Sequence, residues 1–316
     1  HYLVGQGMAL SGEISPAIEE HLLALKLAPK FAQAARSLYS LYGLRGNIDG
    51  MFETGKQLLE IAPRDVSMLM ELARMLTVAG RERQALDLLD QHAGEVALRP
   101  YLSIYRLQIM AQLGSEPDQL LAEFESTLAR HPEELSVKVF HLLLLNQAGD
   151  SERVAQLLPE TLATVDDTRF AADPRAARYS LMLASLAWKH DSQQQAETLY
   201  QALIDSGSAA AAAAANDLAY KLATSGQRID QAEELATFAL AENPGSLSYI
   251  DTMATIHLLR DRPREAVKLF EDNFDVTAIT NPLAIETLAK AYDQSGRGED
   301  ASKLRASLEA ETGSDL

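Results

Sequence analysis

Apolar residues recur at spacings of three and four along almost the whole chain, which is the period of an amphipathic α-helix. Residues 69–76 and 218–222 are two clear stretches of this pattern. Residues branched at Cβ are few and scattered, while alanine and leucine, which favour helices, carry most of the apolar content. The pattern therefore predicts an all-α protein.

Residues that end helices recur at an almost constant interval. The first four are 34 residues apart, and the last three steps are each 35 residues long. In chain order the series is Gly12, Gly46, Gly80, Gly114, Gly149, Asp191, Gly226, Asp261 and Gly296. A second series, about half a repeat further on, is Pro29, Pro63, Pro132 and Pro244. Since glycine accepts the left-handed conformation that ends a helix, and proline prevents a helix from extending, the two series predict repeated helical hairpins.

Small residues follow most of these turns, where the second helix of each hairpin has to approach the first. They are Ala17, Ala85, Ala196, Ala232, Ala266 and Ala301. Gln119 and Val154 stand where alanine is expected, so the repeats around 100–134 and 135–165 are predicted to be degenerate.

These features resemble the tetratricopeptide repeat family over nearly the whole chain. That family places a large–small pair of residues, followed by a bulky one, in the first helix of each hairpin. The pairs here are Val4-Gly5, Leu38-Tyr39, Leu72-Ala73, Leu218-Ala219, Met253-Ala254 and Leu288-Ala289. The resemblance implies an all-α, right-handed superhelical solenoid of about nine hairpins, which serves as a binding scaffold and not as an enzyme.

The repeat is interrupted once. We predict an N-terminal sub-solenoid over 1–163, whose first repeat is truncated, and a C-terminal sub-solenoid over 175–310. Residues 164–174 between them are interpreted as an insertion, either a bend or a harmless longer loop, and the polar tail 311–316 is expected to fray. Because the chain opens inside an amphipathic helix without an initiator Met, we expect it to be a piece of a longer protein.

Composition narrows the classes of partner. The chain has 316 residues, of which 47% are hydrophobic and 23% charged, as in a globular protein. It has no cysteine, which excludes disulfides and thiolate metal sites. Its net charge of -17 without a concentrated basic face argues against nucleic acid and anionic membranes as partners. The acidity either keeps a long surface soluble or serves a neutral or cationic partner.

No constellation of residues predicts chemistry. The seven histidines are not paired at metal-ligand spacing on one helix face, and the motifs of metalloproteases, serine hydrolases and nucleotide-binding proteins are missing. We therefore predict no catalytic residue, metal or cofactor. His257 takes the bulky packing position of its repeat and is expected to be buried or half-buried. No apolar stretch approaches the ~18 consecutive residues that a membrane-spanning helix needs, so no membrane insertion is expected.

The resemblance also implies where a partner binds, because in that family the first helices line a concave groove. Its positions lie two residues before the large residue of each pair, and two, five and six after it. They are occupied by Arg36, Arg74, Gln108, Asn146, Trp188, Lys189, Asn216, Tyr220, Asp251, Glu286 and Lys290. Such a mixture of charged, amide and aromatic groups suits a peptide or an extended polymer. Trp188, the only tryptophan, is the leading candidate, with core packing as the alternative.

The segments 216–220, 230–244 and 249–254 resemble the C-terminal repeats of large bacterial proteins in cell-envelope and exopolysaccharide-export systems. The sequence departs from that pattern at Ala254-Thr255, where glycine and tryptophan are usual. The resemblance implies a periplasmic or envelope-associated scaffold of an assembly or export system. Two alternatives remain: a cytoplasmic adaptor or regulatory module, and an accessory segment of an export complex that binds polysaccharide.

Overall fold

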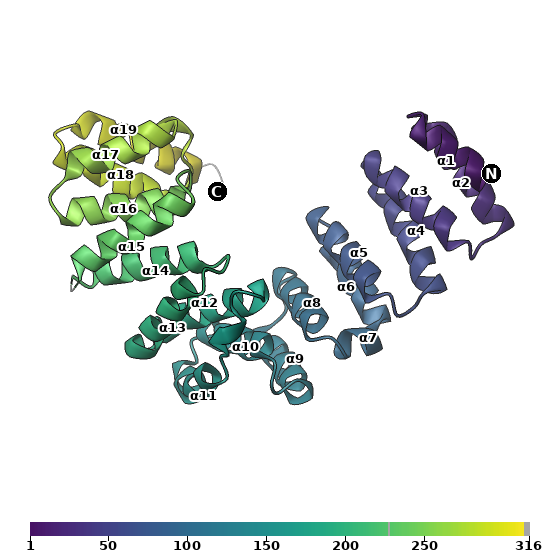
Figure 1. Ribbon diagram of the computed structural model, residues 1–316, viewed down its shortest axis with the longest axis horizontal. Coiled ribbons are helices and arrows are strands. Elements are labelled where there is room, and N and C mark those ends of the chain that lie inside the picture. Colours follow the sequence, from purple (N-terminus) through teal and green to yellow (C-terminus); the bar gives the residue numbers. More distant parts are fainter. Residues whose placement is uncertain (227, 313–316) are drawn as a thin grey trace. The chain divides into compact units, whose positions relative to one another are not determined.

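The computed structural model describes residues 1–226 and 228–312, and this part of the chain consists of α-helices and short 3-10 helices without a β-strand (Figure 1). The chain divides into two compact units, His1–Gly149 (unit 1) and Asp150–Leu316 (unit 2). The prediction of an all-α fold is confirmed, and each unit is described by itself.

Unit 1 contains four helical hairpins and two further helices. The hairpins are α1 (Tyr2–Leu10) with α2 (Ile14–Leu27), α3 (Ala32–Leu44) with α4 (Ile48–Ile61), α5 (Val66–Val78) with α6 (Glu82–Gln91), and α8 (Pro100–Gln112) with α9 (Pro117–Arg130). The further helices are α7 (Ala93–Ala97), which the sequence did not predict, and α10 (Leu135–Gln147). The second helix of each hairpin packs against the first helix of the next, so the hairpins stack in chain order.

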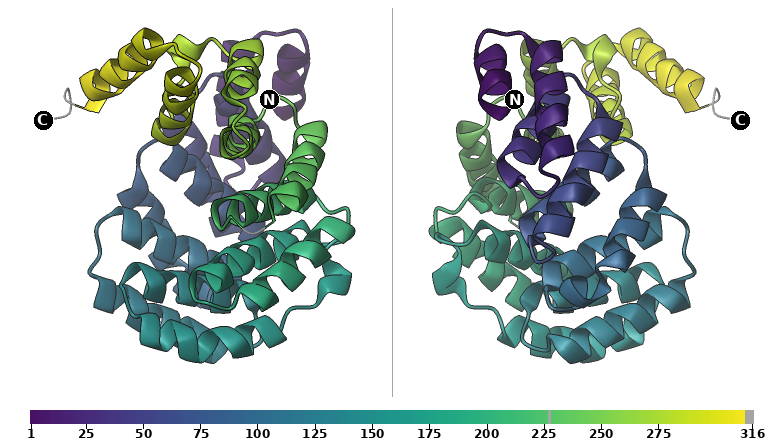
Figure 2. Two further views of the ribbon diagram at one scale, coloured as in Figure 1. Left: turned by 90° about the vertical axis from the view of Figure 1, so that its left-hand side faces the viewer. Right: turned by 90° about the vertical axis from the view of Figure 1, so that its right-hand side faces the viewer.

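Unit 2 repeats the same arrangement. It begins with α11 (Ser151–Ala163) and the 3-10 helix η1 (Asp167–Arg169). Its hairpins are α12 (Pro174–Lys189) with α13 (Gln193–Asp205), α14 (Ala211–Thr224) with α15 (Ile229–Glu242), α16 (Leu247–Leu259) with α17 (Pro263–Asn273), and α18 (Pro282–Gln294) with α19 (Gly298–Thr312). A second 3-10 helix, η2 (Val276–Ala278), precedes α18. Figure 2 shows these hairpins from two sides. The order of helices agrees with the predicted series of about nine hairpins, with α7 as an addition.

The predicted turn residues adopt the backbone conformation for which they were selected. All nine have a positive φ, such as 63° at Gly46. Asp191 and Asp261, with φ of 57° and 58°, adopt the same left-handed conformation although they carry a side chain. Aspartate tolerates this region better than most residues, which explains how it replaces glycine at these two turns.

The predicted small residues lie at the closest contacts between helices. All six alanines of that series have 0% of their surface exposed. Val154 fills the equivalent position in α11 and is equally buried. In α9, by contrast, Gln119 is exposed and the next residue, Leu120, is buried. In this degenerate repeat the buried position of the second helix is therefore shifted by one residue relative to the other repeats.

The insertion at 164–174 is an ordered connection between α11 and α12. Its central residue Phe170 is 1% exposed. The Asp166 carboxylate accepts a hydrogen bond from the Thr168 amide at 3.2 Å, and Asp173 caps the first turn of α12. The division of the chain into two compact units falls after Gly149, so the insertion lies within unit 2. A hinge here stays a prediction, and the predicted tail lies largely outside the described residues, which end at 312.

The first hairpin buries a histidine without a partner. His21 on α2 is fully buried, and neither of its ring nitrogens has a hydrogen-bond partner. Tyr2 and Gly5 of α1 lie against the ring. Burial lowers the pKa of the His21 imidazole, the Glu20 carboxylate opposes this shift, and the amino group of His1 adds to it.

This histidine predicts an acid sensitivity of unit 1. Because the unfolded imidazole binds a proton more readily than the folded one, stability that is fully present above about pH 6.5 begins to fall below that value and continues to fall until the pH passes the lowered pKa of the folded state. His21→Leu removes the titrating group, so its urea midpoint should fall less than that of the unmodified protein between about pH 8 and 5. Equal losses in both proteins would show that His21 does not contribute. At about pH 8 the imidazole is neutral, so a difference in urea midpoint between the two proteins at that pH measures the effect of the substitution on packing alone.

Candidate interaction surface on the first helices

The structure places all eleven predicted groove residues on the first helices of hairpins or on α10. Those classed as exposed are Arg36, Arg74, Gln108, Lys189, Tyr220 and Lys290. Those classed as half-buried are Asn146, Trp188, Asp251 and Glu286. Asn216 is buried, with 8% of its surface exposed. Trp188 is therefore only partly exposed, and the role of each residue in binding stays a prediction.

A line of side-chain interactions connects the first helices of unit 2. The ammonium nitrogen of Lys221 on α14 lies 5.9 Å from the ring centre of Trp188 on α12. The Asp217 carboxylate on α14 raises the pKa of Tyr249 on α16, after burial as the main cause. Further along, the Thr287 side chain on α18 hydrogen-bonds the Asp251 carboxyl on α16. Four successive first helices thus carry adjoining polar groups.

Asp217 and Lys221 form the half-buried centre of this line. Burial raises the pKa of Asp217, opposed by the positive charge of Lys221 and a hydrogen bond from Asn216. Burial lowers the pKa of Lys221, opposed by Asp217. Beneath them Tyr200 of α13 is fully buried, and the pKa of its phenol is raised by burial first and by Asp217 second. Removing one member of the pair would leave its partner's charge poorly solvated.

Two buried acceptors on these helices lack a donor. The Oδ1 atoms of Asn216 on α14 and Asp251 on α16 are shielded from solvent, and neither has a hydrogen-bond partner. The two residues occupy equivalent positions in consecutive repeats, 35 residues apart. Buried polar atoms are normally hydrogen-bonded, so these two atoms mark the part of the first helices where polar groups are least well satisfied.

The first helices of unit 1 are linked in the same way. The Gln6 amide on α1 donates to the Ser37 hydroxyl on α3 at 2.9 Å. The Tyr39 hydroxyl on α3 donates to the Glu71 carboxylate on α5, also at 2.9 Å. Arg36 and Arg74 are exposed and, among the described residues, have no ion-pair partner. This surface therefore differs in charge from that of unit 2.

The last hairpin satisfies its predicted groove residues internally. The Glu286 carboxylate lies 3.8 Å from the Lys290 ammonium group, one turn along α18. Its other oxygen lies 3.3 Å from the Arg305 guanidinium group on α19. Both charges of the predicted pair are thus partly neutralised, so the line from Trp188 to Asp251 offers more unsatisfied groups than the last hairpin.

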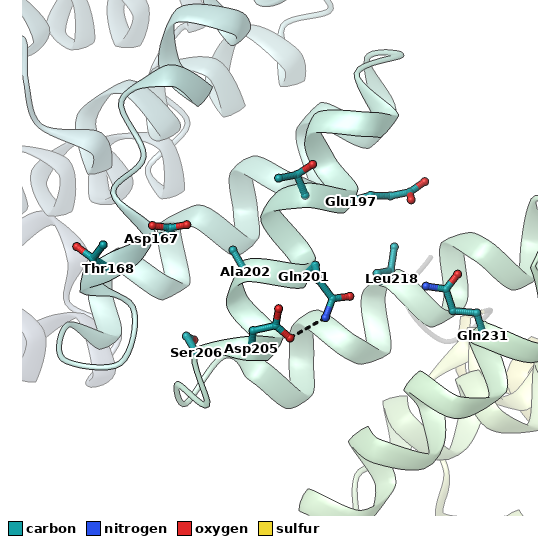
Figure 3. Close-up of a pocket in the computed structure, with 10 residues that line it drawn as sticks. Asp167, Thr168, Glu197, Gln201, Ala202, Asp205, Ser206, Leu218 and Gln231 are labelled. Atoms are coloured by element: carbon teal, nitrogen blue, oxygen red, sulfur yellow. Dashed lines mark hydrogen bonds between the residues drawn. The ribbon is translucent and has the colours of Figure 1, made fainter.

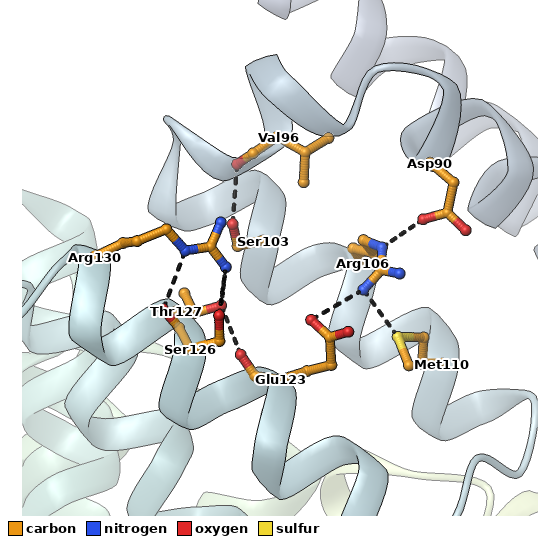
Figure 4. Close-up of polar contacts among 9 residues, drawn as sticks. All are labelled: Asp90, Val96, Ser103, Arg106, Met110, Glu123, Ser126, Thr127 and Arg130. Atoms are coloured by element: carbon orange, nitrogen blue, oxygen red, sulfur yellow. Dashed lines mark hydrogen bonds and ion pairs between the residues drawn. The ribbon is translucent and has the colours of Figure 1, made fainter.

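A polar network in unit 1 holds α6, α8 and α9 around a cavity of about 230 Å³ (Figure 4). The Arg106 Nε donates to Asp90 at 2.6 Å, and its Nη1 lies 3.7 Å from Glu123. The Ser103 hydroxyl donates to the Val96 carbonyl on α7 at 2.9 Å. Since two carboxylates neutralise Arg106, this network stabilises the irregular α6–α9 region and is a poor site for an anion.

Metal-ligand clusters and membrane-spanning helices are two further features that the described residues lack. Within 1–226 and 228–312 no group of three or more histidine, aspartate or glutamate side chains converges as metal ligands do. In the same part of the chain, no helix has the length and apolar character that crossing a membrane requires. His257 is half-buried, as expected, and burial followed by the nearby Arg262 charge lowers its pKa.

Comparisons with known proteins give structural matches only, because no protein-family model and no curated protein sequence matches the chain. A human IFIT1 dimer with m7Gppp-AAAA aligns with a TM-score of 0.51 and 15% identity, over 93% of this chain and 67% of that chain. A monomeric IFIT1 mutant with Gppp-AAAA gives the same TM-score and identity, over 94% and 67%. The chain also covers 56% of a chain from a Naa15/Naa10 structure, at a TM-score of 0.40.

Matches at this identity concern the fold alone. The two IFIT1 matches support the overall arrangement of helices, and the repeat itself rests on the stacked hairpins, the left-handed turn residues and the buried alanines of this chain. The chain has the tetratricopeptide-repeat fold. Yeast Tom70 aligns over 97% of the chain and 90% of its own, at a TM-score of 0.48 and 13% identity.

Tetratricopeptide-repeat spacing selected residues on the first helices but did not select several side chains that interact there. Asp217 and Lys221 each follow a predicted residue, Asn216 and Tyr220, by one position. Tyr249 likewise lies two positions before Asp251. The available signal was the spacing of four between Asp217 and Lys221, which places opposite charges on one helix face.

Proposed function

We propose that this chain is a non-catalytic scaffold that binds protein partners along its first helices. The observation that carries the proposal is the line of half-buried polar and aromatic groups on successive first helices, formed by Trp188, Asp217, Lys221 and Asp251. An extended peptide supplies backbone hydrogen-bonding groups to such a surface, and an aromatic side chain adds contact area.

The finer proposal is a scaffold in a bacterial cell-envelope assembly or exopolysaccharide-export system, in the periplasm. It is supported by the resemblance of residues 216–254 to the terminal repeats of such proteins. A cytoplasmic adaptor is the alternative. Binding of a neutral polysaccharide is a second alternative, favoured only by the partly exposed rings of Trp188 and Tyr220.

Crosslinked pull-downs from separate envelope and cytosolic fractions test the proposal, with Trp188→Ala as a second bait. Partners that use this surface should be captured by the unmodified chain and depleted with the variant, because truncating a central aromatic weakens binding by about tenfold or more. Phe238→Ala on α15 is the matched control, since Phe238 is an aromatic residue exposed at 38% on a second helix.

The outcomes separate the alternatives. Export or assembly proteins that depend on Trp188 support the envelope scaffold, whereas soluble cytosolic proteins with the same dependence support the adaptor. Equal capture by both baits, with equal circular dichroism, removes Trp188 from the site. A purified neutral polysaccharide that binds with the same dependence supports the second alternative.

A further inference from the structure

Two adjoining cavities lie against α13, away from the residues of the proposed peptide surface. The larger has a volume of about 730 Å³ and is drawn in Figure 3. The smaller has a volume of about 450 Å³. Both are lined by Asp167, Thr198 and Ala202, so they form one continuous depression, here called the α13 groove.

The ordered insertion forms one wall of this groove. Leu162 of α11, Val165 and Asp167 come from the segment that leads into η1. The buried Phe170 ring anchors this segment within unit 2. At the end of the segment nearest α12, the Arg169 guanidinium group donates a hydrogen bond to the Asp173 carboxylate at 2.9 Å. The wall is therefore held in place before any partner arrives, which lowers the entropic cost of binding.

One half of the α13 groove is apolar. The smaller cavity is lined by Pro159, Leu162, Ala163, Val165, Leu199 and Ala202. Among these residues only Leu199 is buried, with 7% of its surface exposed. The other five present accessible apolar surface to the cavity. A concave apolar surface of this size accommodates a large aliphatic or aromatic side chain.

The other half is acidic. Glu197 lies there, but Arg228 neutralises it through two hydrogen bonds, one of them 2.9 Å long. Asp167 and Asp205 are exposed and have no ion-pair partner among the residues that the structure describes. The Gln201 amide donates to Asp205 at 2.8 Å, as Figure 3 shows, and so orients its carboxylate.

The position of Asp205 is unfavourable for the helix itself. It is the last residue of α13, where the partial negative charge of the helix end repels a carboxylate. Fold stability therefore gives no reason for an acid at this position. A cation that binds next to Asp205 would be attracted by both the carboxylate and the helix end.

We propose that the α13 groove binds a segment of a partner protein that carries an apolar anchor next to lysine or arginine. The anchor occupies the cavity between Leu162 and Leu199, and the cation lies between Asp167 and Asp205. The net charge of -17 favours the approach of such a segment. Apart from the buried Leu218 of α14, the lining belongs to second helices and the insertion, and it includes none of the polar residues of the first-helix surface proposed above.

The test uses a fluorescein-labelled synthetic peptide with leucine and lysine at helical spacing, titrated with the whole chain at physiological ionic strength. Fluorescence anisotropy gives the affinity. Ala202→Phe fills the junction of the two cavities without a change of charge and should weaken binding by about tenfold. Asp205→Asn should weaken it by about fivefold, as expected for one exposed charge. Ala122→Phe, at an exposed position of α9, is the matched control and should have no effect.

Two further measurements decide the result. A peptide with glutamate in place of lysine should not bind, and hydrogen exchange should slow in α13 and in 162–168 when the lysine peptide is bound. Equal affinity for both peptides, unchanged affinity in Asp205→Asn, or slowed exchange only in unit 1 would overturn the proposal. Asp205→Asn keeps the test valid even where Ala202→Phe disturbs folding, because it relieves the repulsion at the helix end.

Discussion

Phe170→Ala is expected to destabilise unit 2 by about 3–5 kcal/mol, the usual cost of removing a fully buried phenylalanine ring. Phe170 lies in the insertion between α11 and α12, and only 1% of its surface is exposed. It is the largest apolar side chain that fixes this segment, whose other anchors are exposed hydrogen bonds at Asp166 and Asp173. Urea unfolding followed by circular dichroism measures the loss.

The control for this prediction is the same substitution at a surface position. Phe238→Ala removes a ring that is 38% exposed and should cost much less. If both variants lose equal stability, Phe170 does not anchor the insertion. A loss confined to Phe170→Ala would also explain why the wall of the α13 groove is ordered.

Gly55→Ala is expected to cost about 1–3 kcal/mol, although alanine is the better helix former, because the added methyl overpacks the core. Gly55 is a buried residue of α4. A Cβ atom there would meet Leu72 of α5, at 2.7 Å from its Cδ1 atom and closer still to Cδ2. Leu72 is 0% exposed and cannot turn away without displacing its own neighbours.

Gly7→Ala provides a control with the opposite sign. Gly7 lies in α1, is exposed, and an added Cβ would meet nothing within 4 Å. Alanine should therefore stabilise this helix by about 0.5–1 kcal/mol. Thermal unfolding of both variants gives the comparison. A stabilised Gly55→Ala would contradict the close contact between α4 and α5.

The repeat was predictable from the sequence because its markers are backbone constraints. A left-handed turn requires glycine or a tolerant residue such as Asp191, and a close helix contact requires alanine. α7 was not predictable, since five residues without a turn signal have no distinct pattern. The shift of the buried position from Gln119 to Leu120 could not be predicted either, because it depends on how α9 packs against its neighbours.

The repeat spacing assigns candidate residues to the first helices, but it does not show which side chains interact there. The repeat pattern selects single positions, and neighbouring side chains on a helix point about 100° apart. The pattern therefore selected Asn216 and not its neighbour Asp217. The α13 groove was not predicted at all. It depends on where Leu162 and Leu199 meet in space, and they lie on helices separated by the insertion and another helix.

Tyr200 gives the two proposed surfaces a common boundary. Its ring is fully buried on α13, next to Leu199 of the α13 groove, and its phenol interacts electrostatically with Asp217 of the first-helix surface. A ligand that displaces α13 from one side therefore acts on the charged pair at the other. Thermodynamic linkage makes any such effect mutual: the factor by which a groove peptide changes the affinity of a first-helix partner equals the factor by which that partner changes the affinity of the peptide.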